Sequence, residues 1–283
     1  MKIHPLAVVS PQADLAMDVE IGPFAVIEAG AKIAEGCKIG SRAVIKTGTR
    51  LGPNNEVFEG AVLGGLPQHL KMPETLGDVV IGARNTFREN VTVHRGMTPE
   101  HPTVIGDQNL FMVNVHVAHD CVVGNNVIVA NNTMLAGHVE VADRAYVSGA
   151  VGVHQFCRIG RNAMVGGQAH IVKDVPPYVT IDGTSSLIVG LNQVGLRRGG
   201  FTTADVLQLK AAYRLIYRSG LTWNNAMAEL NREFNSGAAA AFCEFFATGK
   251  RGFTPERRMP PNATIRIRHD FNEDEQQRRA AAG

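Results

Sequence analysis

The chain has 283 residues, of which 45% are apolar, and a formal net charge of +2. This length and composition suit one large globular domain or a domain with an appendage, and we expect no nucleic-acid partner at so small a charge. The N-terminal stretch lacks the basic start and apolar block of a signal peptide, and no apolar run approaches the ~18 residues of a membrane span. We therefore expect a cytoplasmic protein without stable membrane insertion.

Apolar residues recur at every sixth position from Ile3 to Ile171. Of these 29 positions only His69, Thr75 and Pro99 are not apolar. The residue four positions after most of them is small, and these small residues include Cys37, Cys121 and Cys157. Because the four cysteines show no CxxC spacing, we expect reduced thiols that fill a core, with no disulfide framework and no zinc site.

A period of six fits neither a helix nor an ordinary half-buried strand, so each hexapeptide is expected to form a short extended side followed by a corner. This pattern resembles the hexapeptide-repeat family of left-handed parallel β-helices, in which three hexapeptides make one triangular coil. The left-handedness is implied by the resemblance alone. Backbone hydrogen bonds between successive coils would place them ~4.8 Å apart.

The repeat loses its phase twice, at residues 69–80 and 98–102, and both segments contain proline. We expect loops that project from the coil there, with the register intact on either side. After Ile171 the sequence DVPPYV is expected to end the repeat, because two successive prolines cannot both donate to a ladder of backbone hydrogen bonds.

Helical patterns follow at residues 202–220, 221–237 and 238–249, the first with Thr202 or Thr203 as its cap and Gly220 as its stop. We thus predict a mainly β chain with a β-helix domain at 1–186 and a helical domain at 187–250. Residues 251–283 are highly charged and are expected to form a disordered tail.

The repeat of three hexapeptides per coil gives the histidines their places. Residues 119, 137 and 155 occupy the third position of their hexapeptides, so His119, Gly137 and Gln155 should stack on one corner, with Asp120 below His138. His119 would then lie ~5 Å from the Gly137 backbone. An imidazole can remove a hydroxyl proton and a glycine leaves a backbone N–H open to an oxyanion, which is the geometry that acyl transfer requires.

The strings HVAHDC, ANNTMLAGHVEV, VHQFC, MVGGQAH, DVPPYV and YRLIYRSG resemble those of the bacterial UDP-N-acetylglucosamine 3-O-acyltransferase family of lipid A synthesis, over residues 1 to about 250. The resemblance implies a homotrimer with active sites between neighbouring prisms. It also implies an (R)-3-hydroxyacyl donor on acyl carrier protein, a UDP-sugar acceptor, and no metal or bound cofactor.

The same resemblance implies roles for individual residues. His119 would be the general base, Asp120 would support its imidazole, and Gly137 N–H would bind the oxyanion. Gly167 would leave room for a longer acyl chain. The residues implied in substrate binding are Lys71, His116, His138, His154, Gln155, Asn192 and Arg198.

Three positions depart from the family pattern. The family usually has an acid at His69, a glutamate at Val194 and a second arginine at Gly199. Because these positions touch the acceptor, the reaction class is better supported than the identity of the sugar.

Other interpretations stay open on the sequence alone. His116, His138 or His154 could simply cap a corner, Gly167 could be a turn glycine, and Lys210, Arg214 and Arg218 could form either a solvated helix face or a docking face for an acidic carrier protein. Alternative functions are an acyltransferase for another nucleotide sugar, such as a 3-amino analogue, a γ-type carbonic anhydrase and an inactive scaffold. The anhydrase is disfavoured because no three histidines have its spacing.

Overall fold

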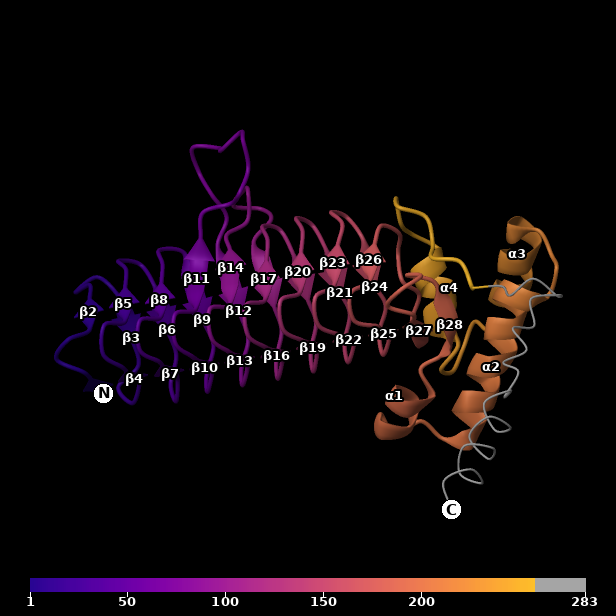
Figure 1. Ribbon diagram of the computed structural model, residues 1–283, viewed down its shortest axis with the longest axis horizontal. Coiled ribbons are helices and arrows are strands. Elements are labelled where there is room, and N and C mark those ends of the chain that lie inside the picture. Colours follow the sequence, from indigo (N-terminus) through magenta and orange to yellow (C-terminus); the bar gives the residue numbers. More distant parts are fainter. Residues whose placement is uncertain (258–283) are drawn as a thin grey trace, which may run out of the picture.

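The protein, described over residues 1–257 by a computed structural model, is an elongated parallel β-helix with a group of helices at its C-terminal end (Figure 1). The coil has three flat faces, which we call face A, face B and face C. From Lys2 to Ile171, successive strands of the chain lie on successive faces, so neighbours within a face are three strands apart. The expected β-helix followed by helices is confirmed.

The strands are short, and their bounds follow the hexapeptide repeat. Face A contains β1 (Lys2–Ile3), β4 (Glu20–Ile21), β7 (Lys38–Ile39), β10 (Glu56–Val57), β13 (Thr86–Phe87), β16 (Leu110–Phe111), β19 (Ile128–Val129), β22 (Tyr146–Val147), β25 (Met164–Val165), β27 (Val179–Ile181) and β28 (Ile188–Leu191). Face B contains β2 (Val8–Val9), β5 (Val26–Ile27), β8 (Val44–Ile45), β11 (Val62–Gly65), β14 (Thr92–His94), β17 (His116–Val117), β20 (Met134–Leu135), β23 (Gly152–Val153) and β26 (His170–Ile171). Face C contains β3 (Asp14–Leu15), β6 (Lys32–Ile33), β9 (Thr49–Leu51), β12 (Val79–Ile81), β15 (Thr103–Ile105), β18 (Val122–Val123), β21 (Glu140–Val141) and β24 (Arg158–Ile159).

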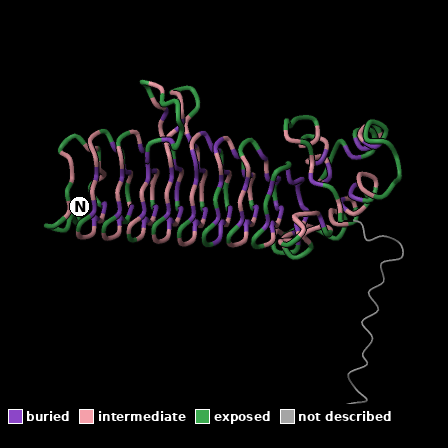
Figure 2. The backbone as a smooth tube through the Cα atoms, turned by 45° about the horizontal axis from the view of Figure 1, so that its top comes forward, coloured by how far each residue is buried: buried purple, intermediate pink, exposed green. Residues whose placement is uncertain are grey.

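The repeated apolar residues fill the inside of the coil. From Ile21 onward, nearly all the repeat residues in the strands are at most 3% exposed, and Phe87 stacks on Phe111 with 5.1 Å between ring centroids. Figure 2 shows the buried residues along the inner side of every coil but the first. The side chain that alternates with each of them points outward, as the period of two in a strand requires.

The corners have a recurrent conformation. Asp120, His138 and Phe156 have φ of 59°, 60° and 66°, and the second residue of each Asn pair, Asn126 and Asn132, has φ of 57° and 61°. Asparagine and aspartate tolerate this left-handed region better than most residues, which explains the frequent Asn at these positions.

Both proline-containing segments project from the corner between face B and face C, which we call the B–C corner. The first loop (residues 66–78) follows β11 and the second loop (residues 95–102) follows β14. In the strands that flank them, Val62 pairs with Thr92 and Thr92 pairs with His116. Compared with a regular coil, the first loop therefore adds two hexapeptides and the second loop adds one. The strands on either side of each loop keep the same register, as expected.

The coil ends later than the sequence indicated. The strand β27, which begins at the last residue of DVPPYV, still pairs in parallel with β25, although Met164 is matched with Thr180 and not with the residue that a full coil of three hexapeptides would supply. The last strand, β28, then pairs with β27 in antiparallel orientation. The prolines end the hexapeptide repeat but lie in the connection before β27, where no ladder hydrogen bond is needed.

Four helices cover this end of the coil: α1 (Gln193–Arg198), α2 (Thr203–Arg218), α3 (Trp223–Glu233) and α4 (Ala240–Phe246). Thr202 caps α2 in a capping box with Asp205, and the other two expected helices correspond to α3 and α4. The short α1 was not expected. Its Leu196 joins Tyr178, Leu209 and Phe242 in a second apolar cluster that attaches the helices to the coil.

The disordered tail expected from residue 251 is wrong for its first residues. Phe253 bridges to Asp174 and Glu256 to Ile188, so residues 251–257 lie against the end of the coil. The rest of that segment, 258–283, lies outside the described residues. Within residues 1–257, no helix combines the length and apolarity needed to cross a membrane.

Candidate active site

The described residues hold nine histidines, and all but His4 lie on face B, at the B–C corner or in its two loops. The repeat explains this clustering, since positions three hexapeptides apart in the sequence lie in adjacent coils. The ring centroids of His119 and His138 are 5.2 Å apart, and those of His94 and His116 are 4.9 Å apart.

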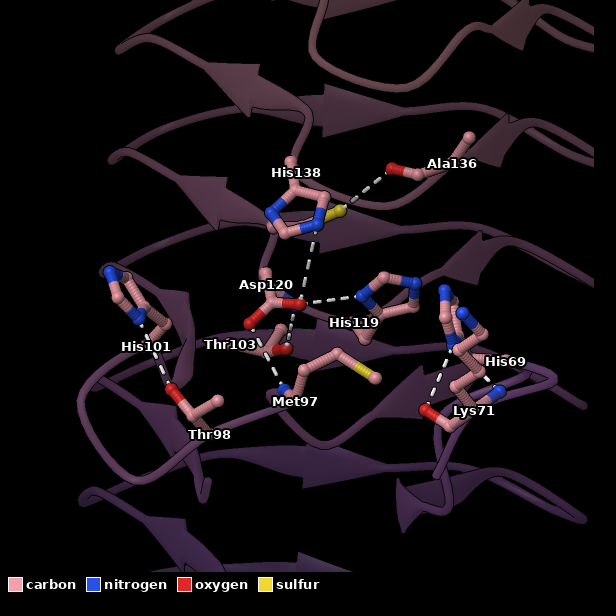
Figure 3. Close-up of polar contacts among 11 residues, drawn as sticks. His69, Lys71, Met97, Thr98, His101, Thr103, His119, Asp120, Ala136 and His138 are labelled. Carbon is pink, nitrogen blue, oxygen red and sulfur yellow. Dashed lines mark hydrogen bonds and ion pairs between the residues drawn. The ribbon is translucent and has the colours of Figure 1, made fainter. Parts of the chain in front are cut away.

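His119 and Asp120 form a buried hydrogen-bonded pair at the B–C corner (Figure 3). Nδ1 of His119 lies 2.5 Å from Oδ2 of Asp120, and the two side chains are only 12% and 4% exposed. The other carboxylate oxygen, Oδ1, accepts a hydrogen bond from the backbone N–H of Met97 at 3.0 Å. A carboxylate at Nδ1 favours the tautomer with the proton on that nitrogen, so Nε2 is left as the proton acceptor.

Gly137 lies directly over the His119 ring. A Cβ atom at residue 137 would lie 2.6 Å from Cε1 and 2.7 Å from Nε2 of His119, so only glycine fits above this imidazole. Within residues 1–257 the Gly137 N–H is paired with no acceptor. The expected stacking of His119 below Gly137 is thus present.

A cavity of about 410 Å³ opens beside this pair. Of the predicted binding residues, His116, His154 and Gln155 line it, together with His119 and Gly137. Lys71 is exposed on the first loop next to His69 but is not among the lining residues.

His138 lies behind the pair instead of in the cavity lining. Its ring stacks on Phe156 with 4.5 Å between centroids, and its Nε2 is 3.7 Å from Asp120 Oδ2. Burial lowers the pKa of His138, while the nearby Asp120 carboxylate opposes that shift. This contact agrees with the prediction from the 18-residue coil that Asp120 lies below His138.

Several residues that line the cavity were not predicted from the sequence. Gln68, Met134, Gly152 and His170 also line the cavity. Along the outer side of face B, Gly152 stands between Met134 and His170, and a Cβ there would touch only His170 Cδ2 at 3.9 Å. The missing side chain leaves space on the outer side of face B. A glycine at an outward-facing position of the repeat is a signal in the sequence that could have indicated this cavity.

His94 was also missed, and it lies behind the cavity. Burial, together with His116 and His119, lowers the pKa of His94 to about 4. Burial, with His119, also lowers the pKa of His116, whose Nδ1 lies 2.8 Å from Thr92 Oγ1. These two rings are therefore neutral at pH 7 and add no positive charge behind His119.

Asn192 and Arg198 line a different cavity of about 660 Å³, over face A and α1. Asn192 has a structural role there, because its Oδ1 accepts from Gly195 N–H as the cap of α1 and its Nδ2 donates to Asn162 O. Gly167 lies at the corner between faces A and B and is in neither cavity lining. A single chain therefore does not bring these residues together with His119.

The three departures from the family pattern divide between the two cavities. His69 lines the first one, with its ring centroid 5.9 Å from that of His119, and its Nδ1 accepts from Lys71 N–H at 3.1 Å. Val194 and Gly199 line the second.

His119, Asp120 and His138 also bring three potential metal-ligand atoms within 4.8 Å of one another. Both carboxylate oxygens of Asp120 already accept hydrogen bonds or face an imidazole nitrogen. The arrangement suits a relay that orients His119, and it differs from the three-histidine site of an anhydrase.

The three basic residues of α2 do not form one open face. Arg218 donates to Glu256 Oε1 from Nε at 2.9 Å and from Nη2 at 2.6 Å. The charge of this arginine is therefore paired within the chain. Arg214 is exposed and Lys210 half-buried. A docking face for a carrier protein would have to use these two.

Comparisons with known proteins find related acyltransferases. Residues 174–254 match the family model of UDP-N-acetylglucosamine O-acyltransferase, domain 2, and residues 102–137 match that of the bacterial transferase hexapeptide. The acyl-[acyl-carrier-protein]–UDP-N-acetylglucosamine O-acyltransferase of Verminephrobacter eiseniae is 47% identical over 88% of this chain and 98% of its own, and that of Burkholderia lata is 45% identical over 89% and 98%.

Solved structures show the same fold. The UDP-N-acetylglucosamine acyltransferase of Francisella novicida superposes with a TM-score of 0.86 at 35% identity, covering 92% of this chain and 95% of that one. The corresponding enzyme of Bacteroides fragilis gives 0.86 at 38% identity, covering 89% and 99%.

Proposed function

The chain belongs to the acyl-[acyl-carrier-protein]–UDP-N-acetylglucosamine O-acyltransferase family, and from this premise we propose that it transfers a (R)-3-hydroxyacyl chain from acyl carrier protein to the 3-hydroxyl of UDP-N-acetylglucosamine in the cytoplasm. This reaction is the first step of lipid A synthesis. The observation that carries the proposal is the buried His119–Asp120 pair beneath the open Gly137 amide.

Nε2 of His119 acts as the general base. It removes the proton of the sugar hydroxyl as the oxygen attacks the thioester carbonyl. Asp120 holds the ring in the required tautomer and stabilises the imidazolium that forms. Because His119 Nδ1 is 2.5 Å from the Asp120 carboxylate, the ring needs no reorientation before the proton moves.

The Gly137 N–H binds the oxyanion of the tetrahedral intermediate. As this intermediate collapses, the C–S bond breaks and the thiol of the carrier protein leaves with the proton held by His119. His116, His154 and Gln155 position the acyl and sugar groups in the cavity, with His138 as a support of Asp120.

The acceptor's nucleotide is proposed to bind at Asn192 and Arg198, with Lys71 near its phosphates. Since Asn192 and Arg198 lie on another side of the chain from His119, the proposal includes a homotrimer in which neighbouring chains supply the two halves of each site. Gly167 limits the acyl length in the same cleft, where glycine leaves room for a longer chain.

The test offers the purified protein UDP-N-acetylglucosamine, its 3-amino analogue and other nucleotide sugars with hydroxyacyl carrier proteins of several lengths, with product identification by mass. O-acylation of UDP-N-acetylglucosamine is expected. Preferred acylation of the amine would instead support the alternative acceptor, for which the imidazole of His69 in place of an acid is the relevant observation.

The variant His119→Ala is expected to lower turnover by on the order of 10²-fold or more while the circular dichroism spectrum stays that of the wild type. An unchanged rate would refute His119 as the base. Stoichiometric zinc in the purified protein would reopen the anhydrase interpretation.

A further inference from the structure

The backbone amide of Asp120 has an unusual hydrogen-bond acceptor. On the same corner, His138 N–H donates to His119 O at 3.1 Å and Phe156 N–H to Gly137 O at 3.2 Å, both backbone carbonyls of the preceding coil. Asp120 N–H donates instead to the side-chain hydroxyl of Thr103 at 2.9 Å.

The second loop explains the difference. It replaces the corner of the preceding coil at this place, so no regular corner carbonyl lies below Asp120. Thr103 is the first residue of β15, directly after the loop, and is fully buried. The loop itself returns Met97 N–H to the Asp120 carboxylate, so both contacts that hold this residue from below come from the inserted segment or its end (Figure 3).

We propose that Thr103 is a positioning residue of the acyltransfer reaction: its hydroxyl, with the Met97 amide, holds Asp120 so that the carboxylate orients His119. Asp120 is a non-glycine residue with φ of 59°, a conformation that the surrounding contacts must maintain. Loss of the hydroxyl frees the buried N–H to seek another partner, and the carboxylate shifts with it. This inference rests on the proposed function of His119 and Asp120.

The test compares Thr103→Val with Thr49→Val. Thr49 is the matched control, because it is also fully buried on face C and its hydroxyl also makes one hydrogen bond, to Leu63 O at 3.2 Å. We expect Thr103→Val to lower kcat by on the order of 10-fold to 100-fold with KM near the wild-type value, because the base is misplaced while the binding residues are not. Thr49→Val should keep the wild-type kcat, and Thr103→Ser should recover most of it.

A wild-type kcat in Thr103→Val, an equal loss in Thr49→Val, or no recovery in Thr103→Ser would each overturn the inference. Should Thr103→Val fail to fold, the smaller Thr103→Ala is judged by the same criteria. The proposed function fails separately, if the wild-type protein itself transfers no acyl chain to any of the nucleotide sugars.

Discussion

At residue 137 a single missing side chain leaves the space that the ring of the proposed base, His119, occupies. A Cβ there would lie 2.6 Å from His119 Cε1, and the ring cannot move aside without breaking its 2.5 Å contact with Asp120. In the proposed mechanism, one glycine and one imidazole from successive coils turn a corner of the β-helix into the catalytic geometry.

Gly137→Ala should therefore displace both the His119 ring and the backbone N–H of residue 137. We expect kcat to fall by on the order of 10²-fold, because both the base and the oxyanion donor shift. Steady-state kinetics on a variant with a normal circular dichroism spectrum measures this. A folded variant with wild-type kcat would show that acyl transfer does not depend on the position of the His119 ring.

The lowered pKa of His94 makes the stability of the folded chain depend on pH. Its pKa is about 4 in the folded chain against an ordinary 6.5, because burial and its two neighbouring imidazoles disfavour the charged form. The unfolded chain therefore binds more protons between these values, and this contribution to stability is complete above about pH 6.5 and is lost as the pH falls towards about 4.

His94→Gln removes that titration. The melting temperature of the wild-type protein is expected to fall between about pH 7 and about pH 5, and the variant should show a smaller fall. Thermal unfolding at the two pH values measures the difference. Equal falls in both proteins would mean that other groups, such as His116 and His138, account for the pH dependence.

At the scale of elements, an ion pair joins the coil to the helices. Asp174 is fully buried and lies 2.8 Å from Arg158 Nη2. The same guanidinium donates to Phe245 O and Thr248 O, and lies 4.3 Å from the centroid of the Phe245 ring. The end of α4 and the segment after it are therefore held on the last coil by one arginine.

Asp174→Ala should leave the Arg158 side chain, which is only 15% exposed, without its partner and destabilise the protein by ~3–5 kcal/mol. The exposed pair of Lys38 and Glu56, 3.3 Å apart, is the matched control, and Lys38→Ala should change the stability little. Chemical denaturation of both variants tests this. Equal stabilities would contradict the role of the buried pair.

The loops show a second effect at this scale. Their lengths keep the coil in register because they add whole hexapeptides, yet the second one removes a corner and so changes the hydrogen bonds of Asp120. An insertion can thus preserve the strand register of the coil and still change the hydrogen bonds of a residue in the next coil.

At the scale of the whole molecule, the two cavities on different sides of one chain are joined only in the proposed trimer. Mixed oligomers of His119→Ala and Arg198→Ala should be more active than either parent, because one chain of each kind supplies an intact half to a shared site. Mixing His119→Ala with Asp120→Asn is the control and should restore nothing, since both changes lie in the same half. Activity no higher than that of the parents would argue for a site within one chain.

The apolar period of six in the sequence determined short extended sides and corners, and with the three hexapeptides per coil that the family resemblance implies it placed corresponding positions of successive coils in contact. The sequence determined from this that His119 lies below Gly137 and Asp120 below His138, and it narrowed the α2 cap to Thr202 or Thr203, of which the structure has Thr202. It could not give the strand β27, whose register departs from the repeat, nor the helix α1, which depends on Asn192 reaching the distant Asn162.

The tertiary structure alone decided which outward-facing residues share a cavity, because contacts between loops, corners and faces depend on where the chain returns after each insertion. Gln68 comes to the His119 site through the first loop, and Gly152 and His170 through the regular stacking of face B, while Asn192, Arg198 and Gly167 lie on other sides of the prism. Thr103 belongs to the same class: its hydroxyl reaches Asp120 because a loop displaced the carbonyl that the repeat would have supplied.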